Sequence, residues 1–257
     1  MAEQYQITGI VAREIIDCRG TPTVQVDVCV DGELRGRADV PSGRSTGTYE
    51  ACELRDGGSR YGGKGVLTAI DNVNSTIANA LAGRDVTEQR AIDRDLVALD
   101  GTADKSRLGA NAILGVSLAV ARAAAATLRL PLHRYLNSAA HVLPVPMMNL
   151  VNGGKLSSND LCFQEFIMMP VGAESFSHAL RMTAEVNLVL RSMTAERYGK
   201  LAINVGDEGG VVPPIVNVRE ALDLLRDAVR ASGYEEHIVY ALDCASTHLY
   251  DPDTRTY

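Results

Sequence analysis

The sequence predicts two domains: an α+β domain over residues 1–138, then about the first half of a β/α barrel over residues 139–257. Two observations lead to this expectation. In the first part, segments with the alternation of strands precede segments with the spacing of helices, which is typical of an α+β domain. In the second part, short apolar strands alternate with helices, which is typical of a parallel α/β layout such as a barrel.

The N-terminal strands are identified by a period of two. Val24, Val26, Val28 and Val30 alternate with mostly polar residues, and Asp31-Gly32 follows as a hairpin signal. The period indicates a half-buried strand. We expect the return strand over residues 33–40, and an earlier strand region over residues 5–16.

Three helices are expected after these strands. Apolar residues of the segment 67–81 fall on one helical face, and the segment 92–99 marks a second helix. The alanine-rich segment 111–128 has high helix propensity, and Pro131 ends it.

The pattern changes beyond a boundary near residues 137–143. Strands are predicted over residues 143–150, 163–169 and 238–242, with helices over residues 176–190 and after the N-cap Asn217. Residues 140–257 amount to roughly half of the ~250 residues that a closed (β/α)₈ barrel uses. We therefore expect the sequence to be the front part of a longer protein.

Charge and cysteine content restrict the class of partner and the compartment. The chain has 32 acidic and 25 basic residues, a net charge of −7, and no Lys/Arg run, which argues against a nucleic-acid partner. Its five cysteines form no C-x-x-C pair, so we expect reduced thiols in a cytoplasmic protein. Residues 1–6 lack the pattern of a signal peptide, and the uncharged stretch 108–121 is too short to cross a bilayer.

Several common catalytic motifs are absent from the sequence. The segment Gly43-Arg44-Ser45 resembles the end of a P-loop, but the motif needs a glycine where Ala38 stands and a lysine in place of Arg44. There is no G-x-G-x-x-G, no G-x-S-x-G, and no pair of histidines at metal-ligand spacing.

Acidic residues at strand ends and in one turn are the candidates for chemistry. Asp243 follows a short apolar strand, where barrel enzymes place catalytic groups, and Mg²⁺ ligation would offset the cost of burying its charge. Glu208 lies in the glycine-rich turn 204–210, and Glu165 opens a predicted strand. If the first two strands form a hairpin, Glu165, Glu208 and Asp243 could converge. A helix cap for Asp243 and an acidic surface turn for residues 204–210 are the alternatives.

Seven segments together carry a family signature. They are DCRGTPTV (17–24), PSGRSTG (41–47), KSRLGANAILGVS (105–117), LPVP (143–146), QEF (164–166), NVGDEGG (204–210) and LDCAS (242–246). On these segments the chain resembles the enolase family over essentially its whole length. The resemblance implies an N-terminal α+β domain, a β/α barrel whose first two strands are antiparallel, and a homodimer. It also implies Mg²⁺-dependent dehydration of 2-phosphoglycerate to phosphoenolpyruvate in glycolysis.

The resemblance also implies roles for single residues. Asp243 would be a ligand of the first Mg²⁺, and Ser45, in a mobile lid, a ligand of the second. Glu208 would assist departure of the hydroxyl with Glu165 beside it, and Gln164 would lie in the substrate pocket. The reaction needs such groups because the C2 proton of a carboxylate is weakly acidic. Divalent cations stabilise the charge that develops, and an acid protonates the leaving hydroxyl.

Two departures from the family pattern bear on the substrate. The family's loop Ser-His-Ala-Gly-Gly reads KLSSN over residues 155–159, so Leu156 replaces the loop histidine, and Arg44 replaces an alanine in the lid. The added charge of Arg44 and Lys155 suggests contacts to a more anionic substrate. An alternative function is therefore that of a paralogue acting on a phosphonate analogue, as in carboxyphosphonoenolpyruvate synthesis in natural-product pathways.

A second alternative is a truncated, non-catalytic enolase-like chain. The family's base lysine and its remaining metal carboxylates belong to the second half of the barrel, which these 257 residues do not include. Retention of Glu165, Glu208 and Asp243 weighs against this alternative.

Overall fold

The computed structural model describes residues 5–257, apart from the Leu156 side chain, and divides the chain into two compact units. The N-terminal unit extends to Gly43 and resumes over Tyr49–His141. The C-terminal unit consists of Arg44–Thr48 and Val142–Tyr257. The segment Arg44–Thr48, which the sequence assigned to the first domain, therefore groups with the second unit. The interpretation of the chain start as lacking a signal peptide falls largely on residues 1–4, which lie outside the described residues.

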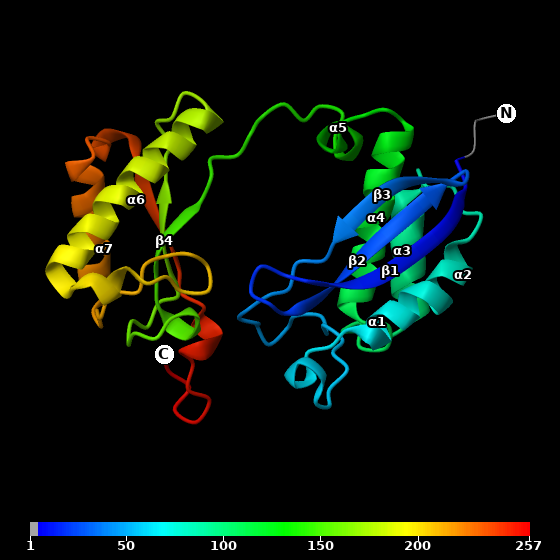
Figure 1. The fold of residues 1–257 in the computed structure, drawn as a ribbon, viewed down its shortest axis with the longest axis horizontal. Helices are drawn as coiled ribbons and strands as arrows, with labels where there is room; N and C mark the ends of the chain where they lie inside the picture. The colour runs from blue at the N-terminus through cyan, green and yellow to red at the C-terminus, as the bar shows by residue number, and fades with distance from the viewer. Residues whose placement is uncertain (1–4) are drawn as a thin grey trace. The chain divides into compact units, whose positions relative to one another are not determined.

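The N-terminal unit begins with an antiparallel sheet in the order β1-β2-β3 (Figure 1). The strands are β1 (Ile7–Ile16), β2 (Pro22–Val30) and β3 (Glu33–Asp39). The strand predicted from the period of two and the two strands expected on either side of it are thereby confirmed. The four alternating valines of β2 are all buried, because the helices of this unit cover that face of the sheet.

The predicted helices of this unit are also confirmed. They are α1 (Leu67–Asn72), a π-helical segment (Val73–Ile77), α2 (Ala78–Leu81), α3 (Gln89–Asp100), α4 (Ala110–Thr127) and α5 (Leu132–Leu136), with a 3₁₀ turn at Arg60–Gly63. The first three are continuous and form the single helix predicted over residues 67–81. Gly101 follows α3 with φ of 72°, a left-handed conformation that ends a helix at little cost for glycine.

Helix α4 packs closely on the sheet through small residues. A Cβ at Gly36 of β3 would lie 2.1 Å from the Ala119 carbonyl oxygen and 2.6 Å from the Ala123 nitrogen, both in α4. A Cβ at Gly115 would meet Val26 at 2.8 Å. By length and hydropathy alone α4 could cross a membrane, but half of its residues are buried inside the protein. Its alanine-rich composition thus follows from its role as the core helix of this unit.

The C-terminal unit contains a second sheet, in the order β4-β5-β6. Its elements are β4 (Met148–Asn152), β5 (Glu165–Met169), α6 (Phe176–Tyr198), α7 (Val218–Ala231) and β6 (Val239–Asp243), with 3₁₀ turns at Gly154–Leu156, Lys200–Ile203, Glu235–His237 and Ser246–His248. Helices α6 and α7 pack on each other and share one core with β4 and β5 (Figure 1). The Asn217 side chain accepts a hydrogen bond from the Arg219 backbone N–H, as expected for the N-cap of α7.

The first two strands of this unit, β4 and β5, are antiparallel as the resemblance implies, and the three strands form an open sheet, which is consistent with a partial barrel. Three expectations for this unit are wrong. The parallel layout expected from the alternation of strands and helices is not found, because β5 pairs antiparallel with both β4 and β6. The strand predicted from residue 143 begins only at Met148, since Pro144 and Pro146 lack the N–H that a ladder needs. The strand predicted to be buried, β6, leaves Tyr240 and Leu242 partly exposed because it lies at the edge of this sheet.

Candidate active site

The ends of the three C-terminal strands bring three polar residues into one row. In the sheet register, Asn152 is paired with Glu165, and Glu165 is paired with Asp243. Because β5 runs opposite to both neighbours, its first residue lies beside the last residue of each. Directly paired residues project from the same face of a sheet. The structure therefore brings Glu165 and Asp243 together, as the hairpin argument from the sequence anticipated.

The carboxyl group of Glu165 has a strongly perturbed acidity. Partial burial, a hydrogen bond with Glu208, and the negative charges of Glu208 and Asp243 raise the pKa of Glu165 from 4.5 to about 8. Desolvation and like charges both favour the neutral form of a carboxyl group. Near neutral pH the Glu165–Glu208 pair therefore holds a proton, which is the property required of a general acid.

Glu208 is presented by a tight hairpin. The backbone N–H of Gly209 donates to the Gly206 carbonyl at 3.1 Å, and that of Gly206 donates to the Gly210 carbonyl at 2.9 Å. Asp207, Glu208 and Gly209 thus form a three-residue loop, in which Gly209 has φ of 85°. This is a common hairpin geometry, and its last loop position favours glycine. Glu208 stands exposed at the tip.

Asp243 is held by two donors. The backbone N–H of Ala245 donates to its Oδ1 at 2.9 Å, and the Gln164 side-chain Nε2 donates to its Oδ2 at 3.0 Å. Gln164 is 3% exposed, and its amide oxygen is buried without a hydrogen-bond partner. Ala245 has φ of 45°, a left-handed conformation that a residue with a Cβ adopts at some cost. The predicted site residues Gln164 and Asp243 are thus in direct contact.

The remaining predicted site residues lie in two loops. The hairpin of residues 206–210, which carries Glu208, is called the acid hairpin below. Arg44 forms an ion pair with Asp207, so its guanidinium contacts a carboxylate of this acid hairpin. Ser45, next to it, is half-buried in the same C-terminal unit. Lys155 is exposed in the 3₁₀ turn after β4. The Leu156 side chain, on which the predicted change of substrate partly depends, lies outside the described residues.

The described residues fit one side of a Mg²⁺ site. Within residues 5–257, no group of three or more His, Cys, Asp or Glu side chains is placed to hold a metal ion. What is present is the Asp243 carboxylate, which accepts from the Gln164 amide nitrogen, and a buried Gln164 amide oxygen without a hydrogen-bond partner. Mg²⁺ in enzymes is often bound through one or two carboxylates, with water and substrate oxygens completing the shell. The donor chemistry is therefore that of a partial Mg²⁺ site and not of an all-protein cage.

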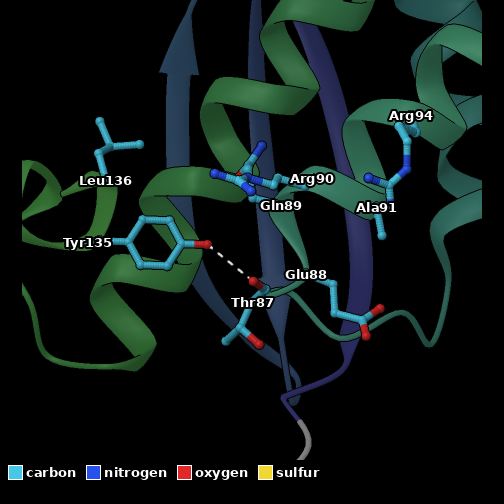
Figure 2. Close-up of a pocket in the computed structure, with 8 residues that line it drawn as sticks. All are labelled: Thr87, Glu88, Gln89, Arg90, Ala91, Arg94, Tyr135 and Leu136. Carbon is cyan, nitrogen blue, oxygen red and sulfur yellow. Dashed lines mark hydrogen bonds between the residues drawn. The ribbon is translucent and has the colours of Figure 1, made fainter. Parts of the chain in front are cut away.

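A separate pocket in the N-terminal unit lacks comparable chemistry. It has a volume of about 640 Å³ and opens at the start of α3. Figure 2 shows the Tyr135 hydroxyl pointing toward Thr87, whose carbonyl oxygen it reaches at 3.4 Å, with Arg90 on the adjacent helix. No carboxylate pair lines this pocket, so we place the candidate active site at the strand ends of the C-terminal unit.

Sequence reasoning missed two residues of this site. Asn152, which the sequence did not single out, ends β4 with no exposed surface. Asp207 lies in the acidic turn 204–210 that the sequence did single out, and the structure shows it pairing with Arg44. A polar residue directly before two glycines was a usable signal, because glycines permit the close backbone approach that buries such a side chain.

Carboxylates gathered at the strand ends of a sheet flanked by helices are the arrangement of a barrel enzyme, and the comparisons agree. The family model described as "Enolase, N-terminal domain" matches residues 7–136, and "Enolase, C-terminal TIM barrel domain" matches residues 140–257. The chain belongs to the enolase family.

Individual relatives give the same result. The chain is 57% identical over 251 residues to the enolase of Methanocaldococcus jannaschii, covering 97% of this chain and 59% of that relative. It is 55% identical to the enolases of Methanococcus aeolicus and Pyrococcus furiosus, covering all of this chain and 60% of each relative. The chain thus spans about 60% of the length of these relatives.

Proposed function

We propose that this chain forms the part of an enolase that protonates the leaving hydroxyl when 2-phosphoglycerate is dehydrated to phosphoenolpyruvate. The observation that carries the proposal is the Glu165–Glu208 pair, which retains a proton near neutral pH beside Asp243. Loss of hydroxide from carbon needs a proton donor, and a carboxyl group with a raised pKa is suited to that role.

The other residues of the site orient a neighbouring side chain or would bind Mg²⁺. Gln164 donates to Asp243 and so fixes the orientation of that carboxylate. In this proposal Asp243 would hold one Mg²⁺ and Ser45 a second, and bound Mg²⁺ would supply positive charge that stabilises the deprotonated substrate carboxylate. The base and further metal ligands would come from the additional barrel segment that the longer relatives have. Homodimer formation and a cytoplasmic location belong to the same proposal and rest on the family resemblance and on the cysteine pattern.

The structure offers less support for the more anionic phosphonate substrate. That alternative needs Arg44 to be available to the substrate, but its guanidinium is engaged by Asp207. Lys155 is exposed and has no such partner among the ion pairs of residues 5–257. The identity of more than half of the residues with known enolases also favours 2-phosphoglycerate.

The proposal is tested by measuring phosphoenolpyruvate formation from 2-phosphoglycerate in the presence of Mg²⁺. The chain is assayed alone and mixed with the separately produced remaining segment of the M. jannaschii enolase. We expect Glu208→Gln to lower turnover by about 100-fold or more in whichever preparation is active, as for loss of a general acid. The exposed Glu236→Gln, a matched change in the turn before β6, should leave turnover unchanged. No product in either preparation would overturn the proposal, and calorimetry with Mg²⁺ would then test for a purely structural chain.

A further inference from the structure

The side chain of Asn152 is buried at the end of β4, and both its amide oxygen and its amide nitrogen are hydrogen-bonded. It has no exposed surface, its Oδ1 accepts from the Gly210 backbone N–H at 2.9 Å, and its Nδ2 donates to the Gln164 carbonyl at 3.3 Å. Its backbone N–H also donates to the Val211 carbonyl at 3.0 Å. An amide side chain is required here, because one partner is a donor and the other an acceptor.

One side of this contact holds the base of the acid hairpin. Gly210 closes the loop that carries Glu208, through its carbonyl bond from Gly206. A Cβ at Gly210 would lie 2.7 Å from Asn152 Oδ1 and 3.0 Å from Asn152 N, so only glycine permits the approach. The hairpin therefore sits directly against Asn152, with no intervening side chain.

The other side of the contact holds the start of β5. Gln164, whose carbonyl accepts from Asn152, immediately precedes Glu165, and Asn152 is also paired with Glu165 in the sheet register. A single side chain thus connects the backbone beside Glu165 with the backbone beside Glu208. Backbone bonds of Val211 to Leu150 and Asn152 hold the end of the hairpin on β4, and the Asn152 side chain adds a direct link from Gly210 to the start of β5. We therefore expect the separation of the two carboxyl groups to depend on this side chain.

We propose that Asn152 is a positioning residue for the acid pair, setting the separation of Glu165 and Glu208 through its bonds to Gln164 and Gly210. The proposal deepens the proposed function, on which its kinetic consequence rests. Asn152 itself touches neither the substrate nor a reacting atom in this scheme. A role in stability alone would predict a uniform loss of protection across the C-terminal unit.

The test compares Asn152→Ala with Asn217→Ala in the full chain. Both changes remove an asparagine whose side chain accepts a backbone N–H, but Asn217 caps α7 away from the acid hairpin. In hydrogen exchange we expect the Gly210 amide to exchange about tenfold faster in Asn152→Ala, as for loss of one hydrogen bond, with α6 and α7 unchanged. Asn217→Ala should accelerate exchange only in the first turn of α7. A Gly210 amide that stays as protected as in the unmodified chain would overturn the proposal.

Steady-state kinetics supply the second readout. In a preparation where the unmodified chain turns over 2-phosphoglycerate, Asn152→Ala should lower kcat by about 100-fold, as for a misplaced catalytic group, with little change in KM. Asn217→Ala should change neither. Equal losses of kcat in the two variants would overturn the positioning role. If the unmodified chain shows no turnover in any preparation, the proposed function fails, and hydrogen exchange at Gly210 alone decides whether Asn152 holds the hairpin.

Discussion

Replacing Glu208 by glutamine should lower the pKa of Glu165. In the unmodified chain that pKa is raised from 4.5 to about 8, first by burial, then by the hydrogen bond and charge of Glu208, and last by the charge of Asp243. The Glu208→Gln change removes the Glu208 charge and replaces a shared-proton contact by a neutral amide. We therefore expect a value below 8 that stays above 4.5, because burial, the largest cause, is unchanged.

The shift also has a consequence for stability. The folded chain holds a proton on Glu165 that the unfolded chain releases above pH 4.5, so the free energy of unfolding falls as the pH rises from 4.5 to about 8. Each pH unit in that window corresponds to at most about 1.4 kcal/mol. Because Glu165 is only partly buried and water screens its charge, we expect about 1–2 kcal/mol in total. In Glu208→Gln the free energy of unfolding should fall by less over the same pH range, because the pKa of Glu165 is raised less.

The measurement is a ¹³C NMR titration of glutamate carboxyl groups with divalent cations removed, assigned with Glu165→Gln. Urea unfolding at a series of pH values gives the stability. Glu235→Gln is the matched control. Arg230 lowers the pKa of Glu235, so the contribution of Glu235 to the free energy of unfolding is constant above pH 4.5 and is lost only at lower pH. A Glu165 midpoint near 4.5 in the unmodified chain, or one that Glu208→Gln does not move, would refute the reasoning.

Three further outcomes are expected. Gly36→Ala should destabilise the N-terminal unit by about 2 kcal/mol or more, because the added Cβ would overlap the backbone of α4. The variant should therefore have a lower Tm, and an unchanged Tm would contradict this packing. Arg44→Ala should lower the free energy of unfolding by at most about 1 kcal/mol, because its ion pair with Asp207 is partly exposed. The same change should raise the rate of proteolysis near residue 44, and high salt should have that effect on the unmodified chain. Arg37 and Arg13 lower the pKa of Asp27 to about 2, so the ionised Asp27 stabilises the unmodified chain above pH 3.8, and this stability is lost as the pH falls toward 2. Asp27→Asn should remove this stability, which urea unfolding at pH 2 and pH 6 would measure.

The N-terminal unit was largely predictable because local and tertiary preferences agree. The alternation of β2 and the alanine-rich run of α4 each specify one structure, and both are found with ends displaced by only a few residues. What the sequence did not indicate is the reason for the alanines. The closeness of α4 to Gly36 is a property of two segments far apart in the chain, and no local pattern contains it.

In the C-terminal unit, the alternation of strands and helices predicted the wrong strand direction, whereas the family resemblance implied the antiparallel pairing of β4 and β5 that is found. Strands that alternate with helices are usually parallel, but α6 and α7 both lie between β5 and β6, and β6 pairs antiparallel with β5. With two helices in the connection, strand direction does not follow from alternation alone. The approach of Glu165 to Asp243 was nevertheless predictable, because it depends only on which strand end each residue occupies.

The site's hydrogen-bond network was beyond the reach of sequence reasoning. Gly210 belongs to the predicted glycine-rich turn 204–210, and in the structure it admits Asn152 at contact distance, which the turn pattern does not indicate. Likewise, Arg44 was assigned to the substrate from its charge alone, and the nearby carboxylate of Asp207 competes for it. Both outcomes depend on distances between segments that lie far apart in the chain.

The reversed direction of β5 separates the support of Glu165 from part of the loop that precedes it. The position of Glu165 is set by its ladder with β4 and β6, while Asn159 of the loop donates to the carbonyl groups of Asn152 and Pro213. We therefore expect a change at the exposed Lys155 to leave the Glu165 carboxyl group in place, whereas a change at Asn159 would act on β4 through Asn152.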